Sequence, residues 1–326
     1  MPIDQAAGAK LAARIGVAPE RVRLRTERSE AGARDLTILP ARGGSPGPTV
    51  IAFHGLGMRI EVFARWLQGL YDTPWTWILP EGPYPFEGRF SGLQSIGHAW
   101  YLWDGNTPAF RASLRESEAR VLELLDDRAA SGVLDPGRTA VVGFSQGAFF
   151  AGSLALRHTE RFCALACVAG RIRPGYAARE ISTIPRLPIL YLHGRDDDVV
   201  EVGRARASAG ELEAHGFPVR FVEVGGGHMW SAEMSNALRG FLRARLGARD
   251  SGTAGERVRP GGSSNPSSGS SSRTTIREPP GSATCWDSAG DPAYEEQARP
   301  DRLAVRHLTG HRFHIWTTSF LVYHGD

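Results

Sequence analysis

Apolar positions along the chain fall into short buried-type runs separated by longer stretches of helical periodicity. Runs typical of strands occur at 49–53, 75–80, 139–144, 164–169, 188–194 and 218–224. Helical spacing of apolar residues marks 59–71, 111–127, 148–157, 201–215 and 231–246. Two short strand-like runs around a turn between 22 and 39 predict an opening hairpin. Strands and helices that take turns favour an α/β fold, with a mostly parallel twisted sheet covered by helices on both faces.

The pattern changes after residue 248. Ser, Gly, Pro and Arg dominate from there to about residue 285, and apolar groups are too few to offset the entropy of ordering. The last stretch, 303–326, is apolar enough for a strand or two. We therefore predict one globular α/β domain over residues 1–248, large enough to carry a catalytic site. A low-complexity, disordered C-terminal extension is predicted over residues 249–326.

Composition is that of an ordinary globular protein. Hydrophobic residues make up 41%, charged residues 22%, and the net charge is +3, so no nucleic-acid partner is predicted. The N-terminus has no secretory pattern and no segment has the apolar length of a membrane span, from which we expect a cytoplasmic protein. Cys163 and Cys167 sit in a strand-like run and Cys285 lies in the tail, so we expect no structural disulfide.

The stretch "VVGFSQGAFF" carries the first candidate for chemistry. Gly143, Ser145 and Gly147 form Gly-x-Ser-x-Gly, directly after a predicted strand and before a predicted helix. A serine on such a turn can project its hydroxyl above the sheet as a nucleophile. The alternative is a tight packing turn in which the serine has no chemical role.

A serine hydroxyl needs a base, and the base needs an acid to orient it. An acidic run, Asp196 to Asp198, follows the predicted strand 188–194, and His228 follows the strand 218–224. The order serine, aspartate, histidine along the chain is that of α/β hydrolases. His228 is thus the candidate base, and one of the three aspartates is the candidate acid.

Backbone donors for the oxyanion are predicted in two places. The stretch "HGLG", residues 54–57, follows the strand 49–53, and its glycines allow the main chain to turn N–H groups inward. Gln146 follows the serine at a helix N-terminus, where the dipole also favours an anion. We assign the oxyanion hole to the N–H groups of Leu56 and Gln146.

A metal site is the competing explanation of the acidic run. His193, His228 and the three aspartates could gather at strand ends. Hydrolytic zinc sites, however, usually show closely spaced ligands such as His-Glu-x-x-His, and the chain has no such motif. We predict neither a metal nor any other cofactor.

Four motifs in order, "HGLG", "GFSQG", "LHGRDDDVV" and "GGGH", make the chain resemble the phospholipase/carboxylesterase family of α/β hydrolases. That family includes acyl-protein thioesterases and small bacterial carboxylesterases. The resemblance covers roughly residues 22–246. It implies Ser145 as nucleophile, Asp197 as acid and His228 as base, with the amides of Leu56 and Gln146 at the oxyanion.

Aromatic residues near these motifs favour an apolar substrate. Trp100 and Trp103 lie in a stretch similar to one beside the family's active site, and Trp230 follows His228. With Met58 they are candidates for the wall of an acyl pocket. The sequence thus predicts a serine hydrolase acting on a small-molecule ester or thioester. A serine peptidase, or a non-catalytic binding protein of the same fold, is the alternative, and the oligomeric state stays open.

Overall fold

The computed structural model describes residues 3–25, 34–41, 47–90, 93–105, 107–135, 137–177, 181–247, 304–306 and 312–314. The strands of the main sheet are β1 (Val22–Arg25), β2 (Asp35–Ile38), β3 (Thr49–Phe53), β4 (Thr76–Pro80), β7 (Thr139–Phe144), β8 (Ala164–Val168), β9 (Ile189–Gly194) and β10 (Val219–Val224). The helices are α1 (Gln5–Ile15), α2 (Ile60–Trp66), α3 (Pro108–Ala130), α4 (Gln146–Arg157), α5 (Pro174–Ala177), α6 (Val202–Ala214) and α7 (Ala232–Leu246). Short 3₁₀ turns occupy Pro19–Arg21, Gln68–Leu70 and Thr159–Arg161.

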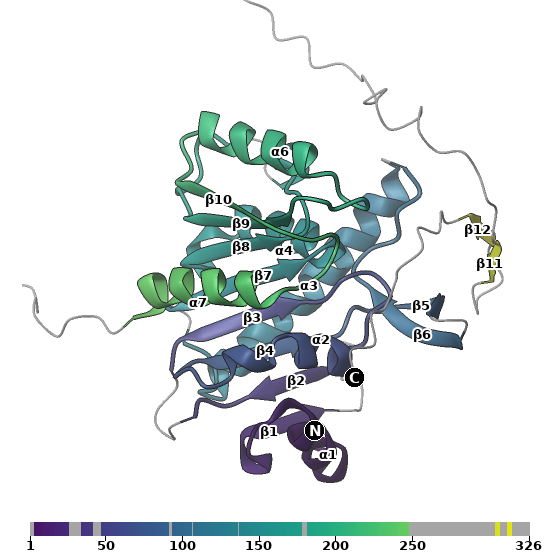
Figure 1. Ribbon diagram of the computed structural model, residues 1–326, viewed down its shortest axis with the longest axis vertical. Helices are drawn as coiled ribbons and strands as arrows, with labels where there is room; N and C mark the ends of the chain where they lie inside the picture. Colours follow the sequence, from purple (N-terminus) through teal and green to yellow (C-terminus); the bar gives the residue numbers. More distant parts are fainter. Residues whose placement is uncertain are drawn as a thin grey trace, which may run out of the picture. The chain divides into compact units, whose positions relative to one another are not determined.

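The eight strands form one sheet in the order β1-β2-β4-β3-β7-β8-β9-β10 (Figure 1). The strands from β4 through β3, β7, β8 and β9 to β10 pair in parallel, and β1 and β2 pair antiparallel at one edge. This topology confirms the predicted α/β-hydrolase fold. The carboxyl ends of the parallel strands meet along one edge of the sheet, which is where such folds place their sites.

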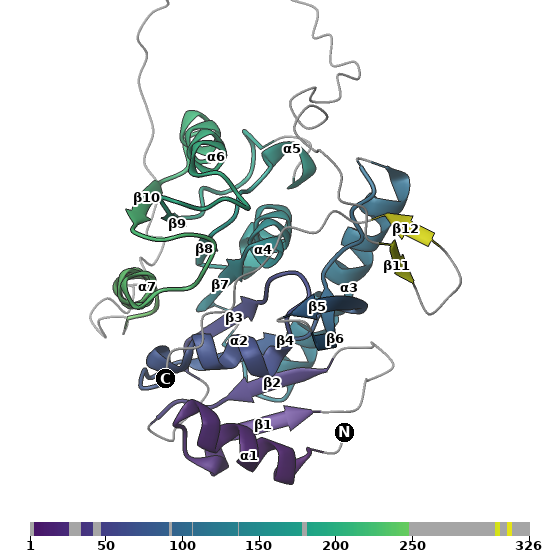
Figure 2. The same ribbon diagram turned by 45° about the vertical axis from the view of Figure 1, so that its right-hand side comes forward.

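Successive side chains of each strand point to opposite faces of the sheet, and helices cover the apolar side chains on both faces. In β7, Ala140, Val142 and Phe144 pack into the core beneath α1, α2 and α7. Val141 and its neighbours on other strands pack into the core beneath α3, α4 and α6. Figure 2 shows α7 on one side of the sheet and α3 and α4 on the other. Strand residues buried on both faces explain why the apolar runs in the sequence are unbroken.

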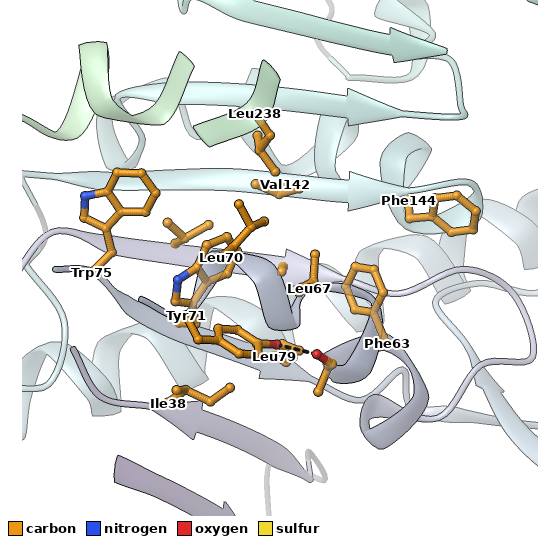
Figure 3. Close-up of a cluster of buried hydrophobic side chains, with 14 of the residues drawn as sticks. Ile38, Phe63, Leu67, Leu70, Tyr71, Trp75, Leu79, Val142, Phe144 and Leu238 are labelled. Carbon is orange, nitrogen blue, oxygen red and sulfur yellow. Dashed lines mark hydrogen bonds between the residues drawn. The ribbon is translucent and has the colours of Figure 1, made fainter. Parts of the chain in front are cut away.

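The first core is rich in large side chains near the centre of the sheet (Figure 3). Phe63 and Leu67, from α2 and the residue after it, lie close to Phe144 and Val142 of β7. Tyr71 is buried there too, and its hydroxyl donates to the carbonyl of Ala64 at 3.0 Å. The core thus fixes α2 against the end of β7, on which the candidate site depends.

The helix ends carry ordinary capping signals. The Asp4 side chain accepts from the N–H of Ala7 at the start of α1, and the Ser231 hydroxyl accepts from the N–H of Met234 at the start of α7. Thr107 caps α3 in the same way, with Pro108 at the first helical position. These local signals explain why the predicted helices agree with the observed ones to within a few residues.

Two parts of the fold differ from the sequence-based expectation. The helix α1 precedes the opening strands, where no element is predicted. The Gly- and Pro-rich segment 81–107, predicted to be a loop, contains the antiparallel hairpin of β5 (Tyr84–Phe90) and β6 (Leu93–Ala99). Glycine and proline interrupt the apolar spacing in this segment, so the strand period is not visible in the sequence. The two strands pair with each other, and this pairing supplies their backbone hydrogen bonds.

The predicted extension, residues 249–326, lies outside the described residues except for two short strands. These are β11 (Ala304–Arg306) and β12 (Arg312–His314), which pair antiparallel. The disorder predicted for this extension therefore stays a prediction. Among the helices that the structure describes, none is both long and apolar enough to cross a membrane.

Candidate active site

Ser145 lies on the sharp turn between β7 and α4. Its backbone adopts φ 54° and ψ −118°, a region that residues other than glycine rarely occupy. Its N–H donates to the carbonyl of Val168 at 2.9 Å, and its carbonyl accepts from Ala148 at 2.9 Å. These contacts hold a strained backbone in place, as is common at functional sites. The half-buried serine is thereby set at the carboxyl end of the sheet.

The two glycines of the motif permit close approach of the main chain around this turn. A Cβ on Gly143 would lie 2.2 Å from the carbonyl oxygen of Gly147. A Cβ on Gly147 would lie 2.3 Å from the carbonyl oxygen of Phe53, in the neighbouring strand β3. Both distances are far below van der Waals contact. The motif therefore brings Ser145 against the end of β3, where the predicted oxyanion loop begins.

The candidate base stands between Ser145 and a carboxylate. His228, in the loop after β10, has its Nε2 2.9 Å from Ser145 Oγ. Its Nδ1 lies 2.8 Å from Asp197 Oδ2 and 3.0 Å from Asp197 Oδ1. With the proton on Nδ1, the imidazole donates to the carboxylate and can accept from the serine hydroxyl. Three side chains from three separate loops thus form one hydrogen-bonded chain.

Asp197 is set apart from its two neighbours by burial. Its side chain is fully buried, whereas Asp196 and Asp198 are exposed. The N–H groups of Val199 and Val200 donate to its Oδ1 at 3.0 and 2.8 Å. Of the three aspartates that the sequence left open, Asp197 is the one hydrogen bonded to His228.

The electrostatics of this carboxylate favour its charged form. Burial by itself raises the pKa of Asp197, but hydrogen bonds from His193 and His228 outweigh that effect and hold the pKa well below its usual value. The carboxylate is therefore ionised at neutral pH. An ionised acceptor at this position favours the Nδ1–H tautomer of His228.

The loop of residues 54–58, which contains the predicted oxyanion stretch 54–57, follows β3 directly. Within the part of the chain that the structure describes, neither the N–H of Leu56 nor that of Gln146 donates to another protein group. Gln146 is the first residue of α4, so its N–H has no acceptor within the helix. Both predicted donors are thus available beside the end of β7.

Buried hydrogen bonds fix the start of this loop. The Nε2 of His54 accepts from the N–H of Gly82 at 3.0 Å, and its Nδ1 donates to the carbonyl of Gly55 at 2.8 Å. Burial lowers the pKa of His54 to about 4, so the ring is neutral at pH 7. The carbonyl of His54 accepts from Trp100 Nε1 at 2.9 Å. His54 therefore organises the loop, as its place at a strand end suggests.

The β5–β6 hairpin holds the other end of the loop, a contribution that the sequence analysis missed. The N–H of Gly57 donates to the carbonyl of His98 at 2.8 Å, and the N–H of His98 donates to the carbonyl of Met58 at 3.1 Å. A Cβ on Gly97 would lie 1.8 Å from the carbonyl oxygen of Gly57. A glycine before a histidine in an irregular segment was the only sequence signal for this contact.

A partly buried ion-pair network supports the same region. His98 Nε2 lies 3.3 Å from Glu81 Oε2, and Arg34 NH1 lies 3.1 Å from Glu81 Oε1. Arg34 also pairs with Glu61, in the first turn of α2. The network joins the hairpin to the helix that follows the oxyanion loop. None of these charged residues was singled out in the sequence, because their spacing along the chain follows no motif.

The four predicted pocket residues fall in different surroundings. Trp103 is 38% exposed and packs edge-on against Phe110. Met58 and Trp230 are partly buried against the first core. Trp100 differs from the prediction, because it is 1% exposed and stacks on Phe150. Its indole is a core group beneath the oxyanion loop rather than a wall of an open pocket.

One aromatic residue beside the base was not predicted. The ring of Phe144, next to the serine, lies 5.2 Å from the ring of His228 and 5.2 Å from that of Trp66. Trp66 is 38% exposed at the end of α2. Its apolar surface is therefore available close to the candidate base.

The described residues also form hollows away from the predicted site. Two hollows lie along α3, and neither is lined by Ser145, Asp197 or His228. Over the same residues, no group of three or more His, Cys, Asp or Glu side chains is arranged to hold a metal ion.

Proteins of known structure share this fold. Residues 40–246 match the family model described as Phospholipase/Carboxylesterase. The structure of esterase PE8 is 25% identical, with a TM-score of 0.54, over 64% of this chain and 97% of that one. Acyl-protein thioesterase 2 of Zea mays is 25% identical, with a TM-score of 0.52, over 66% of this chain and 99% of that one.

A carboxylesterase of Mesorhizobium loti shares the fold at 19% identity, with a TM-score of 0.55, over 68% of this chain and 98% of that one. The family match spans the predicted strand-end motifs from the oxyanion loop to His228. The chain therefore belongs to the phospholipase/carboxylesterase family and is a hydrolase of the esterase and thioesterase type.

Proposed function

We propose that this protein hydrolyses carboxylic esters or thioesters of small molecules through an acyl-enzyme on Ser145, without a cofactor. The observation that carries the proposal is the position of His228, with Nε2 2.9 Å from Ser145 Oγ and Nδ1 2.8 Å from Asp197 Oδ2. A nucleophile, a base and an orienting acid in hydrogen-bond contact are what acyl transfer requires.

In the first half of the reaction, the Ser145 hydroxyl attacks the acyl carbon while His228 Nε2 takes its proton. The imidazolium is stabilised by the ionised Asp197 and then gives the proton to the leaving alcohol or thiol. The bond to the leaving group breaks, and the acyl group stays on Ser145. In the second half, water attacks the acyl-enzyme with His228 again as base, which releases the carboxylic acid and the free serine.

The negative charge on the carbonyl oxygen would be met by the N–H groups of Leu56 and Gln146. Both are unengaged donors in the described structure, and Gln146 opens α4, whose dipole favours an anion. Loss of one such donor typically slows acyl transfer by about 10² to 10³. The buried contacts of the 54–58 loop support this assignment, since preorganised donors need no rearrangement during the reaction.

The substrate class is inferred from the surroundings of the serine and from the relatives. Met58, Trp103 and Trp230, together with Trp66, offer apolar surface to an acyl chain. The two relatives at 25% identity are an esterase and an acyl-protein thioesterase. We therefore expect uncharged acyl groups on either an oxygen or a sulfur leaving group.

The test is activity-based labelling combined with turnover. Wild-type protein should react with a fluorophosphonate and hydrolyse p-nitrophenyl esters. A thioester with the same acyl group shows whether sulfur leaving groups are accepted. The Ser145→Ala variant should fold, yet lose both labelling and turnover. Ser182→Ala, at an exposed serine, is the matched control and should keep both labelling and turnover.

The alternative functions give other results in the same assay. A serine peptidase of this fold would be labelled by the fluorophosphonate but would hydrolyse peptide amides in preference to esters. A non-catalytic binding protein would leave the probe and the esters untouched. Equal turnover by wild type and Ser145→Ala would refute the assigned nucleophile.

A further inference from the structure

A second histidine lies behind the acid of the proposed triad. His193 is in β9, and its side chain is fully buried. Its Nε2 lies 2.6 Å from the carbonyl oxygen of Val200 and 3.2 Å from Asp197 Oδ2. That same carboxylate oxygen lies 2.8 Å from Nδ1 of His228. Two imidazole nitrogens thus face one oxygen of Asp197.

The surroundings of His193 determine where its proton lies. Both neighbours of Nε2 are acceptors, so Nε2 carries the hydrogen and donates. The Nδ1 of the ring is buried and has no hydrogen-bond partner among the described residues. A buried nitrogen without a partner destabilises the fold, whereas an apolar ring of similar size at this position would avoid that cost. The polar contribution of this ring is therefore its single donor.

We propose that His193 is a positioning residue that holds the carboxylate of Asp197 in the orientation that receives His228. The inference rests on the proposed function, because it assigns Asp197 the role of the acid. The two donors from Val199 and Val200 hold Oδ1, and His193 supplies the donor that holds Oδ2 beside His228.

The same histidine also closes the loop that carries the acid. Asp197 comes four residues after His193, and Val200 comes seven after it. Because Nε2 lies within reach of both, its hydrogen links the middle and the end of the loop to the last residues of β9. Without this donor, Asp197 Oδ2 would retain His228 as its remaining side-chain donor, and rotation of the carboxylate would be less restricted.

The ionisation of Asp197 agrees with this role. The interaction with His193 is one of several hydrogen bonds that keep the pKa of this buried carboxyl low, besides those from His228 and the Val200 backbone. Removing the His193 donor makes Asp197 Oδ2 a stronger acceptor for His228. The protonated form of His228 is then favoured, so the acidic limb of kcat/KM moves to higher pH, since that limb reports the base of the free enzyme.

The test uses two substitutions at one position in the full-length protein. His193→Phe keeps a planar ring without the donor, and His193→Gln can place an amide N–H where Nε2–H lies. With p-nitrophenyl acetate, His193→Phe should lower kcat about tenfold with little change in KM. Its acidic limb should lie at higher pH than that of the wild type. His193→Gln should recover most of kcat and the wild-type limb.

A wild-type limb in His193→Phe, a limb at lower pH, or equal losses in both variants would overturn the proposal. If His193→Phe does not fold, as judged by circular dichroism, NMR of histidine-labelled wild-type protein decides the matter. We expect His193 as the Nε2–H tautomer, and an Nδ1–H tautomer would refute the inference. Failure of the proposed function is recognised separately, because then the wild type shows no labelling at Ser145.

Discussion

The side-chain amide of Gln146 accepts a hydrogen bond from the backbone N–H of Trp100 at 2.9 Å. The same amide donates to the carbonyl of Tyr101 at 3.1 Å. Gln146 therefore ties the start of α4 to the segment that follows the β5–β6 hairpin. Its own backbone N–H is one of the two proposed oxyanion donors, so one residue both supplies the donor and anchors the neighbouring segment.

The first prediction concerns this anchor. Gln146→Ala keeps the backbone N–H but loses both side-chain bonds, so we expect kcat for p-nitrophenyl esters to fall about tenfold, the effect of roughly 1.4 kcal/mol. Circular dichroism should show an unchanged fold. Gln68→Ala, at an exposed glutamine, should keep wild-type kcat. Wild-type kcat in Gln146→Ala would show that the anchor does not affect the reaction.

A second prediction concerns the close approach at the serine turn. In Gly147→Ala the new methyl would meet the carbonyl oxygens of Phe53 and His54 at 2.3 and 2.5 Å, and backbone cannot yield as a flexible side chain does. We expect the free energy of unfolding in urea to drop by at least ~2 kcal/mol. The matched control is Gly240→Ala in α7, where nothing lies near the added Cβ.

Gly240→Ala should leave activity unchanged and stabilise the protein by ~0.5–1 kcal/mol, because alanine loses less backbone entropy in a helix. If both variants unfold at the same urea concentration, the argument from close packing at Gly147 is wrong.

The third prediction separates the three consecutive aspartates. Asp197→Asn removes the charge that favours the Nδ1–H tautomer of His228, and we expect kcat to fall by ~10³ to 10⁴. Asp196→Asn and Asp198→Asn change exposed neighbours and should keep kcat within about twofold. Steady-state kinetics on the three purified variants measures this. A large loss in either exposed variant would move the acid to that residue.

The fourth prediction uses the neutral, buried His54. Its pKa is about 4 in the folded protein and about 6.5 in the unfolded chain. Between these values the unfolded chain binds a proton that the folded protein excludes, so stability rises with pH. On acidification from pH 7 to pH 4, His54 should lower the free energy of unfolding by on the order of 3 kcal/mol at most.

The measurement is the difference between wild type and His54→Gln, a variant that keeps an acceptor for the N–H of Gly82 and does not titrate. Urea unfolding at several pH values should show that the wild type loses more stability than the variant as pH falls through 6.5 toward 4. Parallel pH profiles for the two proteins would contradict the predicted burial of a neutral ring.

The strands of the main sheet, most helices and the turn that holds Ser145 could be predicted from the sequence. Each depends on a local signal: unbroken apolar runs for strands buried on both faces, helical spacing and capping residues for helices, and small residues around the serine. The order of serine, aspartates and histidine at successive strand ends also indicated one site, because parallel strands bring their carboxyl ends to the same edge.

Other features depend on contacts between residues far apart in the chain, for which the sequence has no local signal. Asp197 differs from Asp196 and Asp198 by its burial and by its contact with His228, which lies 31 residues further along the chain. Trp100 looks like a pocket residue in the sequence, yet it stacks in the core because β6 brings it over α4.

The support of the oxyanion loop follows the same rule. Gly97 of β6 packs against Gly57 of the 54–58 loop, and Arg34 joins Glu81 to Glu61 of α2, although these residues are far apart in the chain. The sequence by itself determined the strands of the main sheet and most helices, because these follow from local periodicity, and it set the chain order of the candidate side chains. Tertiary structure decided which carboxylate, which donors and which aromatic rings meet, because hydrogen bonds and burial depend on distances that only the folded chain sets.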